Sequence, residues 1–383
     1  MEAALDGIRV LDLSRALAGP YCAMMLGDMG ADVIKLEHPQ GGDEARSWGP
    51  PFQAGESSYF LAVNRNKRSI TLDLKTEAGK EALRRLVKTA DVLLENFSPG
   101  VLAKLGFSWE TLHELNPRLV YCAISGFGQL GPRKFQPAYD QILQGMGGLM
   151  SVTGEPDGPP TRFGVSIADI GAGMFSAFAI VNALFYRERS GEGQMIDTSL
   201  LDGQVALLTF QAGRFFATGD SPGRIGNRHP LIAPYEVFKS GDGYVNLAVG
   251  NDKQWVAFCK AMKLEDLGQD ATLANNQGRV SRRESLKARI ESCFADFTTA
   301  EIVTTLEAVN VPCGPIYNIK EVFADPQAEA LGLRYKLEHS TAGEISVTAP
   351  PYRFSGSPAQ VRLAPPTLGQ HTAEILKEIG LAD

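Results

Sequence analysis

The chain has 383 residues, of which 44% are apolar and 21% are charged, and its net charge at pH 7 is −7. This composition is that of a globular protein with a sizeable core and with room for two domains. The negative charge and the lack of a long basic run argue against nucleic acid as a partner.

The cysteine and apolar patterns indicate a cytoplasmic protein that does not enter a membrane. The five cysteines show neither CxxC nor metal-ligand spacing, which favours reduced thiols and predicts no metal site. Residues 1–12 carry acids and no apolar core, so we expect no secretory signal peptide. The longest apolar stretch, residues 170–186, is about 17 residues long and is interrupted by glycines, which favours a buried helix over a membrane span.

The first half of the chain alternates strands with helices, a pattern typical of an α/β fold with a parallel, Rossmann-like sheet. Largely apolar strands are predicted at residues 7–13, 31–37, 69–73, 92–95 and 119–124. Helices are predicted at residues 21–29, 77–89, 101–104 and 109–115. The turn after the first strand contains no GxGxxG, which argues against a dinucleotide-binding dehydrogenase.

The pattern changes in the second half, where we predict a smaller α+β domain. Its signal is Ser240-Gly241-Asp242-Gly243, a hairpin turn between apolar runs. The predicted division is a large Rossmann-like domain at 1–200, completed by 330–383, a helical linker at 201–225, and the small domain at 226–325. The further elements predicted are helices at 170–188, 200–218, 253–262, 281–295, 299–309 and from 372, and strands at 235–238, 244–249 and 345–347.

Several common catalytic motifs are missing, and their absence directs attention to Asp169. There is no G-x-S-x-G elbow and no GxxxxGK[ST] phosphate loop, and the five histidines form no motif. Asp169 opens a glycine-rich, mostly apolar helix. Such a carboxylate is either a helix cap or a nucleophile in a dry site, and backbone N–H groups stabilise it in both cases. The local sequence alone favours the cap.

The loops that follow the predicted strands carry the other candidates, because open α/β sheets place ligands at the carboxyl ends of their strands. Lys75 and Lys104 lie in two of these loops, where a lysine suits the phosphates of a nucleotide-like ligand. Taken singly, each of these lysines is more often a solvated surface charge.

The same loops carry a resemblance to the family III CoA-transferases, the superfamily of formyl-CoA transferase, carnitine CoA-transferase and methylacyl-CoA racemase. It extends over essentially the whole chain. The matching blocks include Ala18-Gly19-Pro20, Gly30-Ala31-Asp32-Val33-Ile34-Lys35-Leu36-Glu37, Asn66-Lys67-Arg68-Ser69-Ile70, Glu95-Asn96-Phe97-Ser98-Pro99-Gly100, Asp169 with Gly171 and Gly173, Val311-Pro312-Cys313-Gly314-Pro315 and Leu368-Gly369-Gln370-His371-Thr372. Trp48-Gly49-Pro50-Pro51-Phe52 and Ile232-Ala233-Pro234-Tyr235 are most similar to the branch that acts on dicarboxylates such as succinate, glutarate and hydroxymethylglutarate.

The resemblance implies a reaction and a set of ligand contacts. Asp169 would attack an acyl-CoA thioester and form an aspartyl–acyl anhydride, which reverses the preference for a cap. Coenzyme A is then a substrate and no tightly bound cofactor is expected. The positions that match CoA contacts of the family are His38, Leu72, Lys75, Asn96, Phe97, Lys104 and Tyr139, of which His38 and Lys104 replace arginines. The resemblance also implies an interlocked, ring-like homodimer.

Two questions stay open from the sequence. A dicarboxylic substrate needs a cation for its far carboxylate, and Arg162, Arg228 and His229 are candidates because bidentate arginine suits that group. The alternatives to a transferase are a 2-methylacyl-CoA racemase or epimerase and a CoA-binding protein without catalysis. A racemase needs a His/Asp pair across the α-carbon, but Tyr139 stands where the racemase branch has its histidine.

Overall fold

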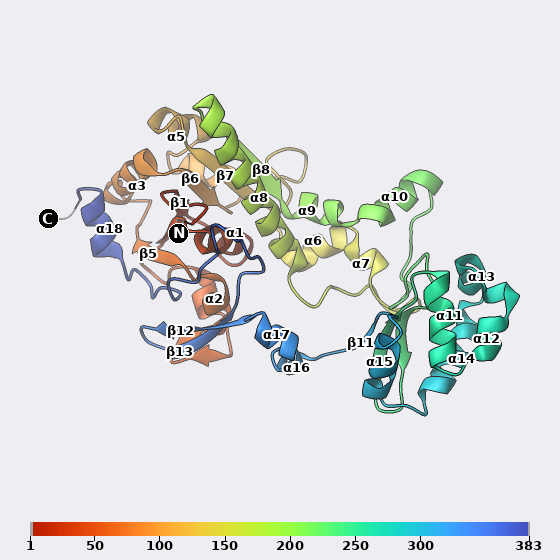
Figure 1. Cartoon of the computed structure of the whole chain (residues 1–383). Coiled ribbons are helices and arrows are strands. Elements are labelled where there is room, and N and C mark those ends of the chain that lie inside the picture. Colours follow the sequence, from red (N-terminus) through yellow and green to blue (C-terminus); the bar gives the residue numbers. More distant parts are fainter. Residues whose placement is uncertain (1–2, 382–383) are drawn as a thin grey trace. The chain divides into compact units, whose positions relative to one another are not determined.

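The predicted parallel sheet is present in the computed structural model, which describes residues 3–381 (Figure 1). Six parallel strands lie in the order β5-β2-β1-β6-β7-β8. They are β1 (Arg9–Asp12), β2 (Asp32–Glu37), β5 (Lys67–Thr71), β6 (Val92–Glu95), β7 (Val120–Ser125) and β8 (Met195–Ser199). Counted along the chain this order is 3-2-1-4-5-6, that of doubly wound folds. The connections reverse direction between β1 and β6, so a crevice opens at the carboxyl ends of these two strands.

Helices cover both faces of the sheet because adjacent strand residues point to opposite sides. In β1, Val10 belongs to one buried cluster and Leu11 to the other. The first cluster is covered by α1 (Ala18–Asp28) and α8 (Ile167–Ser190), and the second by α3 (Glu77–Thr89), α5 (Trp109–Leu115) and α18 (Thr372–Glu378) (Figure 1).

Helix α8 is the central helix of the first cluster. Ala172, Ser176 and Ile180 are among its buried residues, and a Cβ atom added to Gly173 would lie 2.6 Å from the carbonyl oxygen of Ala18. The backbones of α1 and α8 therefore approach as closely as glycine permits. Within residues 3–381, α8 is also the one helix long and apolar enough to span a bilayer, and half of its most apolar window is buried in the fold.

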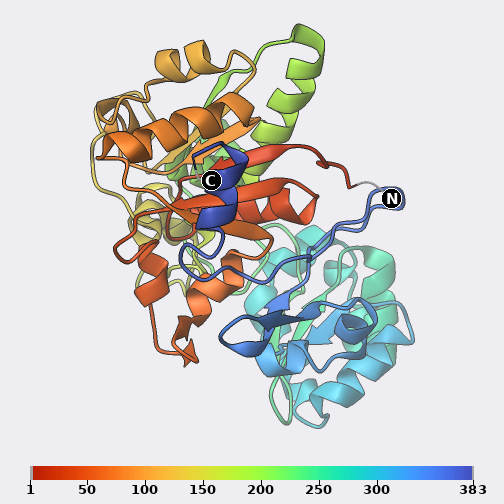
Figure 2. The same cartoon turned by 90° about the vertical axis from the view of Figure 1, so that its left-hand side faces the viewer.

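The C-terminal segment lies along β5, the edge strand of the sheet (Figure 2). The Asn66 N–H donates to the carbonyl oxygen of Leu363 over 2.9 Å, and the His371 N–H donates to that of Ser69 over 2.9 Å. The Thr71 N–H donates to Thr372 Oγ1 over 3.1 Å. Backbone groups that an edge strand leaves unpaired are thereby satisfied.

Two compact units divide the chain. Unit 1 contains residues 1–150, 162–220 and 326–383, and unit 2 contains residues 151–161 and 221–325. The remaining elements of unit 1 are β3 (Phe52–Gln53), β4 (Glu56–Ser57), α2 (Ser58–Val63), α4 (Val101–Lys104), α6 (Asp140–Met146), α9 (Leu200–Leu207), α10 (Thr209–Thr218), α17 (Pro326–Ala330), β12 (Arg334–His339) and β13 (Gly343–Thr348). The short helix α7 (Leu149–Val152) contains the boundary between the two units.

Unit 2 is built on an antiparallel sheet of order β11-β10-β9 and has its own buried core, which includes Trp255 and Phe258. Its elements are β9 (Tyr235–Lys239), β10 (Tyr244–Ala248), α11 (Asp252–Ala261), α12 (Glu265–Gln269), α13 (Asn276–Ser281), α14 (Arg283–Phe294), α15 (Thr299–Glu307), β11 (Cys313–Pro315) and α16 (Ile319–Val322). The predicted hairpin is confirmed, since Asn246 of β10 pairs with Val237 of β9.

Several sequence expectations need correction. The helix predicted at 200–218 is two helices, α9 and α10, because Thr209 adopts a positive φ of 41°. Helix α1 begins at Ala18 and takes Pro20 into its first turn, where a missing N–H costs nothing. Strand β8 was not predicted. Residues 201–220, expected as a linker, group with unit 1, and residues 151–161 group with unit 2.

Candidate active site

A cleft lies at the carboxyl ends of β1, β2, β5 and β6, all in unit 1. Its open volume is about 870 Å³. Four residues that the sequence analysis assigned to CoA line it, namely His38, Leu72, Lys75 and Phe97. Its lining surface is mostly apolar, as in ligand sites generally, although the lining also includes Ser14, Arg15, Glu37, Asp43 and Asp73. Lys104 is exposed at the end of α4 and lines neither this cleft nor the cavity described next.

A second cavity, about 930 Å³ in open volume, contains Asp169. Asn96 and Tyr139 line it too, so two further predicted residues stand beside the predicted nucleophile. Trp48 and Tyr59 complete an aromatic wall, with their rings 4.9 Å apart in edge contact. Burial, together with the nearby carboxylates of Asp169, Asp140 and Asp43, raises the pKa of Tyr59 to about 12.

The cleft and this cavity meet at Arg15, which lines both. Asn96 Oδ1 accepts from the Arg15 N–H and Asn96 Nδ2 donates to the Arg15 carbonyl oxygen, each over 2.8 Å. These bonds join the loops after β1 and β6, the two strands that flank the reversal in strand order. The Arg15 guanidinium lies 5.3 Å from the centre of the Phe97 ring.

Glu95 fixes the backbone of Phe97 from behind. Its Oε2 accepts from the Phe97 N–H over 2.5 Å, and its Oε1 accepts from the Tyr121 hydroxyl over 2.8 Å. Burial raises the pKa of Glu95 to about 7, although both hydrogen bonds favour the charged form. The buried carboxyl group of Glu95 therefore fixes the conformation of the Asn96–Phe97 turn.

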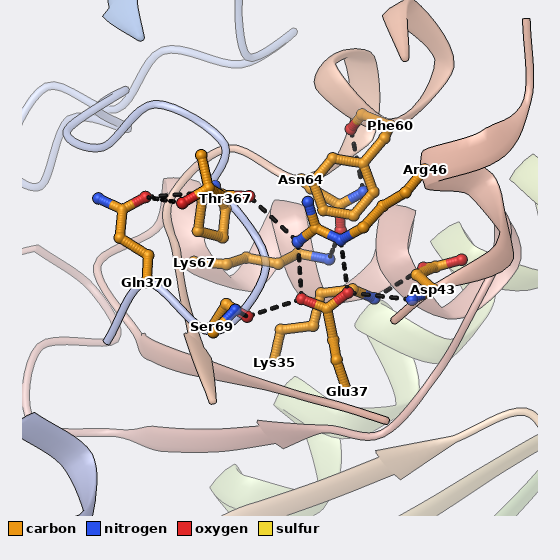
Figure 3. A network of polar contacts seen from close by, with 12 residues as sticks. Lys35, Glu37, Asp43, Arg46, Phe60, Asn64, Lys67, Ser69, Thr367 and Gln370 are labelled. Atoms are coloured by element: carbon orange, nitrogen blue, oxygen red, sulfur yellow. Dashed lines mark hydrogen bonds and ion pairs between the residues drawn. The ribbon is translucent and has the colours of Figure 1, made fainter. Parts of the chain in front are cut away.

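A buried network of charges supports the loops after β1 and β2 (Figure 3). Glu37 accepts from Nε and Nη2 of Arg46, each over 2.7 Å, and Lys35 Nζ lies 2.9 Å from Asp43 Oδ2. Asp43 Oδ1 accepts from the N–H of Ala16, a residue with a positive φ of 64°. Such a conformation is unfavourable for alanine, so Asp43 stabilises the shape of the loop that carries Arg15.

Lys67 and Asp12 form a second ion pair in the same network. Lys67 Nζ is 2.8 Å from Asp12 and also donates to the Pro20 carbonyl oxygen and to Asn64 Oδ1. Lys67 and Asp12 are fully buried, and each is compensated by the other. The network thus joins β1, β5 and the start of α1 beneath the site.

Asp169 is the third residue of α8 and has no hydrogen-bond partner among residues 3–381. It does not cap the helix, because the N-cap position is Ser166. Burial, together with the smaller effect of the negative charge of Asp140, raises the pKa of Asp169 to about 7. A desolvated carboxylate without hydrogen bonds is a stronger nucleophile than a capping one.

The three residues proposed to bind a distal carboxylate, Arg162, Arg228 and His229, already contact other groups of the protein. Arg162 donates to the carbonyl oxygens of Phe163 and Gly164, each over 3.1 Å. Arg228, in unit 2, is paired with Glu284 over 3.0 Å and lies 3.6 Å from Glu236. His229 stacks on Tyr235 at 5.0 Å. A ligand of Arg228 would have to displace two carboxylates.

Comparison with known proteins identifies the family. The sequence profile described as CoA-transferase family III matches residues 5–372. The chain belongs to CoA-transferase family III. A crystal structure of a CAIB/BAIF family protein from Brucella suis superposes with a TM-score of 0.89 and 43% identity, covering 99% of this chain and 100% of that one.

The relatives of this family III CoA-transferase indicate an enzyme. The "Succinate--glutarate CoA-transferase" of Agrobacterium fabrum is 47% identical over 98% of this chain and 95% of its own. The "Succinyl-CoA:mesaconate CoA-transferase" of Haloarcula hispanica is 40% identical over 99% of this chain and 97% of its own. The protein is therefore a CoA-transferase.

Sequence reasoning missed Arg15 and Asp140. Arg15 lies in the loop after the first predicted strand, but nothing in the sequence showed that this loop meets the one after β6. Only the order of strands in the sheet, in which β1 is next to β6, shows this contact.

Proposed function

We propose that this protein transfers CoA between an acyl-CoA thioester and a free dicarboxylic acid, with Asp169 as the nucleophile. The observation that carries the proposal is the position of Asp169, a partly buried carboxylate with a raised pKa, in a cavity that shares Arg15 with the cleft at the sheet's switch point. The choice of dicarboxylic acids follows the relatives named for succinate, glutarate and mesaconate.

Each exchange balances through two intermediates on Asp169. The carboxylate attacks the thioester carbonyl, forms an aspartyl–acyl anhydride and releases CoA thiolate. The thiolate attacks the aspartyl carbonyl of the anhydride, which gives an aspartyl-CoA thioester and frees the first acid. The second acid repeats these steps in reverse and leaves as the new acyl-CoA. Covalent catalysis of this kind divides one difficult exchange into easier steps.

The cleft and the cavity divide the substrate between them. We expect the nucleotide part of CoA to contact His38, Leu72, Lys75 and Phe97, with Lys104 at the outer end of α4. We expect the thioester to lie near Tyr139 and Asn96. The apolar and aromatic walls of the cavity limit water, which would otherwise hydrolyse the anhydride.

We further propose that the protein acts as a homodimer in the cytoplasm, without a tightly bound cofactor. The support for the homodimer is an exposed apolar face on α8, where Phe178 is 71% exposed and Phe185 is 65% exposed. Apolar surface of this kind on a core helix fits a second copy of the chain. Light scattering of the wild type and of a Phe178→Asp, Phe185→Asp variant tests this, and a monomeric wild type would contradict it.

The experiment that tests the activity is a matrix of acyl-CoA donors against mono- and dicarboxylic acids. We expect exchange with dicarboxylic acids, complete loss in Asp169→Asn, and capture of an Asp169 hydroxamate by hydroxylamine. Asp220→Asn, a change at an exposed aspartate on the loop after α10, is the matched control. Full activity of Asp169→Asn, or a wild type that transfers no CoA to any acid, would contradict the proposal. The variants Arg162→Ala, Arg228→Ala and His229→Ala test the distal-carboxylate roles suggested by the sequence.

A further inference from the structure

We propose that Arg15 binds the second carboxylate of the dicarboxylic substrate and so determines the choice between dicarboxylic and monocarboxylic acids. The inference rests on the proposed function, because it concerns the acid that reacts at Asp169. It adds a substrate-binding residue, in unit 1, to those considered from the sequence.

The first argument is position. In the part of the chain that the structure describes, Arg15 is the one cation among the residues that line the Asp169 cavity. The other charged residues in its lining are Asp169 itself and Glu44. An acid whose first carboxylate reacts at Asp169 brings a second negative charge into a cavity that already holds the carboxylates of Asp169 and Glu44. Among these like charges, the second carboxylate is favoured next to the guanidinium of Arg15.

The second argument is availability. The Arg15 side chain is exposed, and its guanidinium has no hydrogen bond or ion pair with any residue from 3 to 381. Its contact is with the face of the Phe97 ring, 5.3 Å away, which leaves the N–H groups at its edge free. Those groups form a planar fork that matches a carboxylate. Arg228 differs in this respect, since two glutamates already occupy it.

The third argument is preorganisation. Asn96 holds the N–H and the carbonyl oxygen of Arg15 over 2.8 Å each, and Asp43 holds the next N–H, that of Ala16, over 3.0 Å. The Cα of Arg15 is therefore fixed while its side chain is free to adjust. A ligand gains affinity from such a site because the backbone is already ordered.

Glu44 also lines the Asp169 cavity, and its carboxylate repels an anion. The second carboxylate is therefore expected to bind Arg15, and the acyl chain then extends from Asp169 toward the boundary with the cleft. Because the Arg15 fork is on a side chain, diacids of somewhat different length fit the same arrangement.

The test compares glutarate with pentanoate, which has the same number of carbons and a methyl group in place of the second carboxylate. Steady-state rates are measured for the wild type, Arg15→Met and Arg15→Lys with one acyl-CoA donor. In Arg15→Met we expect kcat/KM for glutarate to fall roughly 10- to 100-fold, with little change for pentanoate. Arg15→Lys keeps the charge but loses the fork, so its loss is smaller. Arg84→Met, on α3 away from both cavities, is the control for a lost surface arginine.

An alternative role for Arg15 is contact with the phosphates of CoA, since it lines the cleft as well. In that case KM for the donor rises in Arg15→Met and both acceptors lose rate equally, which would overturn the inference. Calorimetric binding of glutarate and pentanoate to Asp169→Asn, with and without Arg15→Met, provides a second measurement. Equal glutarate affinity in the two proteins overturns the inference as well. A failure of the proposed function is distinct, because it is seen in the wild type as a lack of transfer to any acid.

Discussion

Asp140 Oδ1 accepts a hydrogen bond of 2.8 Å from the backbone N–H of Ala168, the residue immediately before Asp169. Asp140 lies on α6, so a carboxylate from another helix satisfies the first turn of α8, where Ser166 makes no side-chain cap. Gln144 donates to Asp140 Oδ2 over 2.8 Å and accepts from the Phe163 N–H over 2.8 Å. Helix α6 therefore holds the nucleophile's backbone in place and also places a negative charge near it.

This relationship predicts a pH shift in Asp140→Asn. The asparagine oxygen keeps an acceptor for the Ala168 N–H, while the negative charge that raises the pKa of Asp169 is removed. The acid limb of the kcat/KM profile should move to lower pH, yet stay above that of an ordinary aspartate because burial is the larger cause. Asp140→Ala loses the acceptor too and should lose activity at every pH. An unmoved acid limb in Asp140→Asn would refute the charge effect.

The wild type should itself lose activity in mild acid. The reactive form of Asp169 is the carboxylate, and its pKa is raised to about 7. Transfer should be near its plateau above pH 8 and fall about tenfold per pH unit well below 7. Initial rates between pH 5 and 9, with thermal melts at each pH to exclude unfolding, measure this. Constant activity down to pH 5 would show that Asp169 titrates as an ordinary aspartate.

The same pKa predicts that Asp169→Asn stabilises the fold at alkaline pH. In the unfolded chain Asp169 titrates near its ordinary value of 3.8, and in the folded protein near 7. Because the folded-state pKa is the higher one, ionisation costs stability progressively from about pH 4 to 7, and the full cost is present above 7. The variant should melt a few degrees higher than the wild type at pH 8 and almost equally at pH 4.5. Equal melting temperatures at pH 8 would be inconsistent with a desolvated carboxylate.

Gly173 predicts a steric effect on both stability and activity. In Gly173→Ala the new Cβ would lie 2.6 Å from the carbonyl oxygen of Ala18, so α1 must move away from α8. We expect a loss of about 1–3 kcal/mol in unfolding free energy and lower activity, since Ala18 lines the Asp169 cavity. Urea unfolding and transfer rates measure the two effects. Gly213→Ala on α10, where a Cβ meets nothing within 4 Å, is the control and should cost nothing.

Local pattern was sufficient to predict much of unit 1, and helix 77–89 and strand 92–95 agree with the structure residue for residue. Both have strong apolar periodicity and clear ends. Strand β8, Met-Ile-Asp-Thr-Ser, was not predicted because it is short and half polar, and it forms because it pairs with the edge of β7. The roles of Arg15 and Asp140 were not predicted for a related reason. Arg15 bonds to Asn96, which lies 81 positions further along the chain and is brought close by the strand order, and Asp140 bonds to Ala168 on another helix.

The hydrogen bonds between β5 and residues 363–372 also bear on how the protein is made. During translation, β5 leaves the ribosome long before the segment that covers it, and until then its free backbone groups can pair with another nascent chain. A message that ends early would therefore yield an aggregation-prone product rather than a smaller working enzyme.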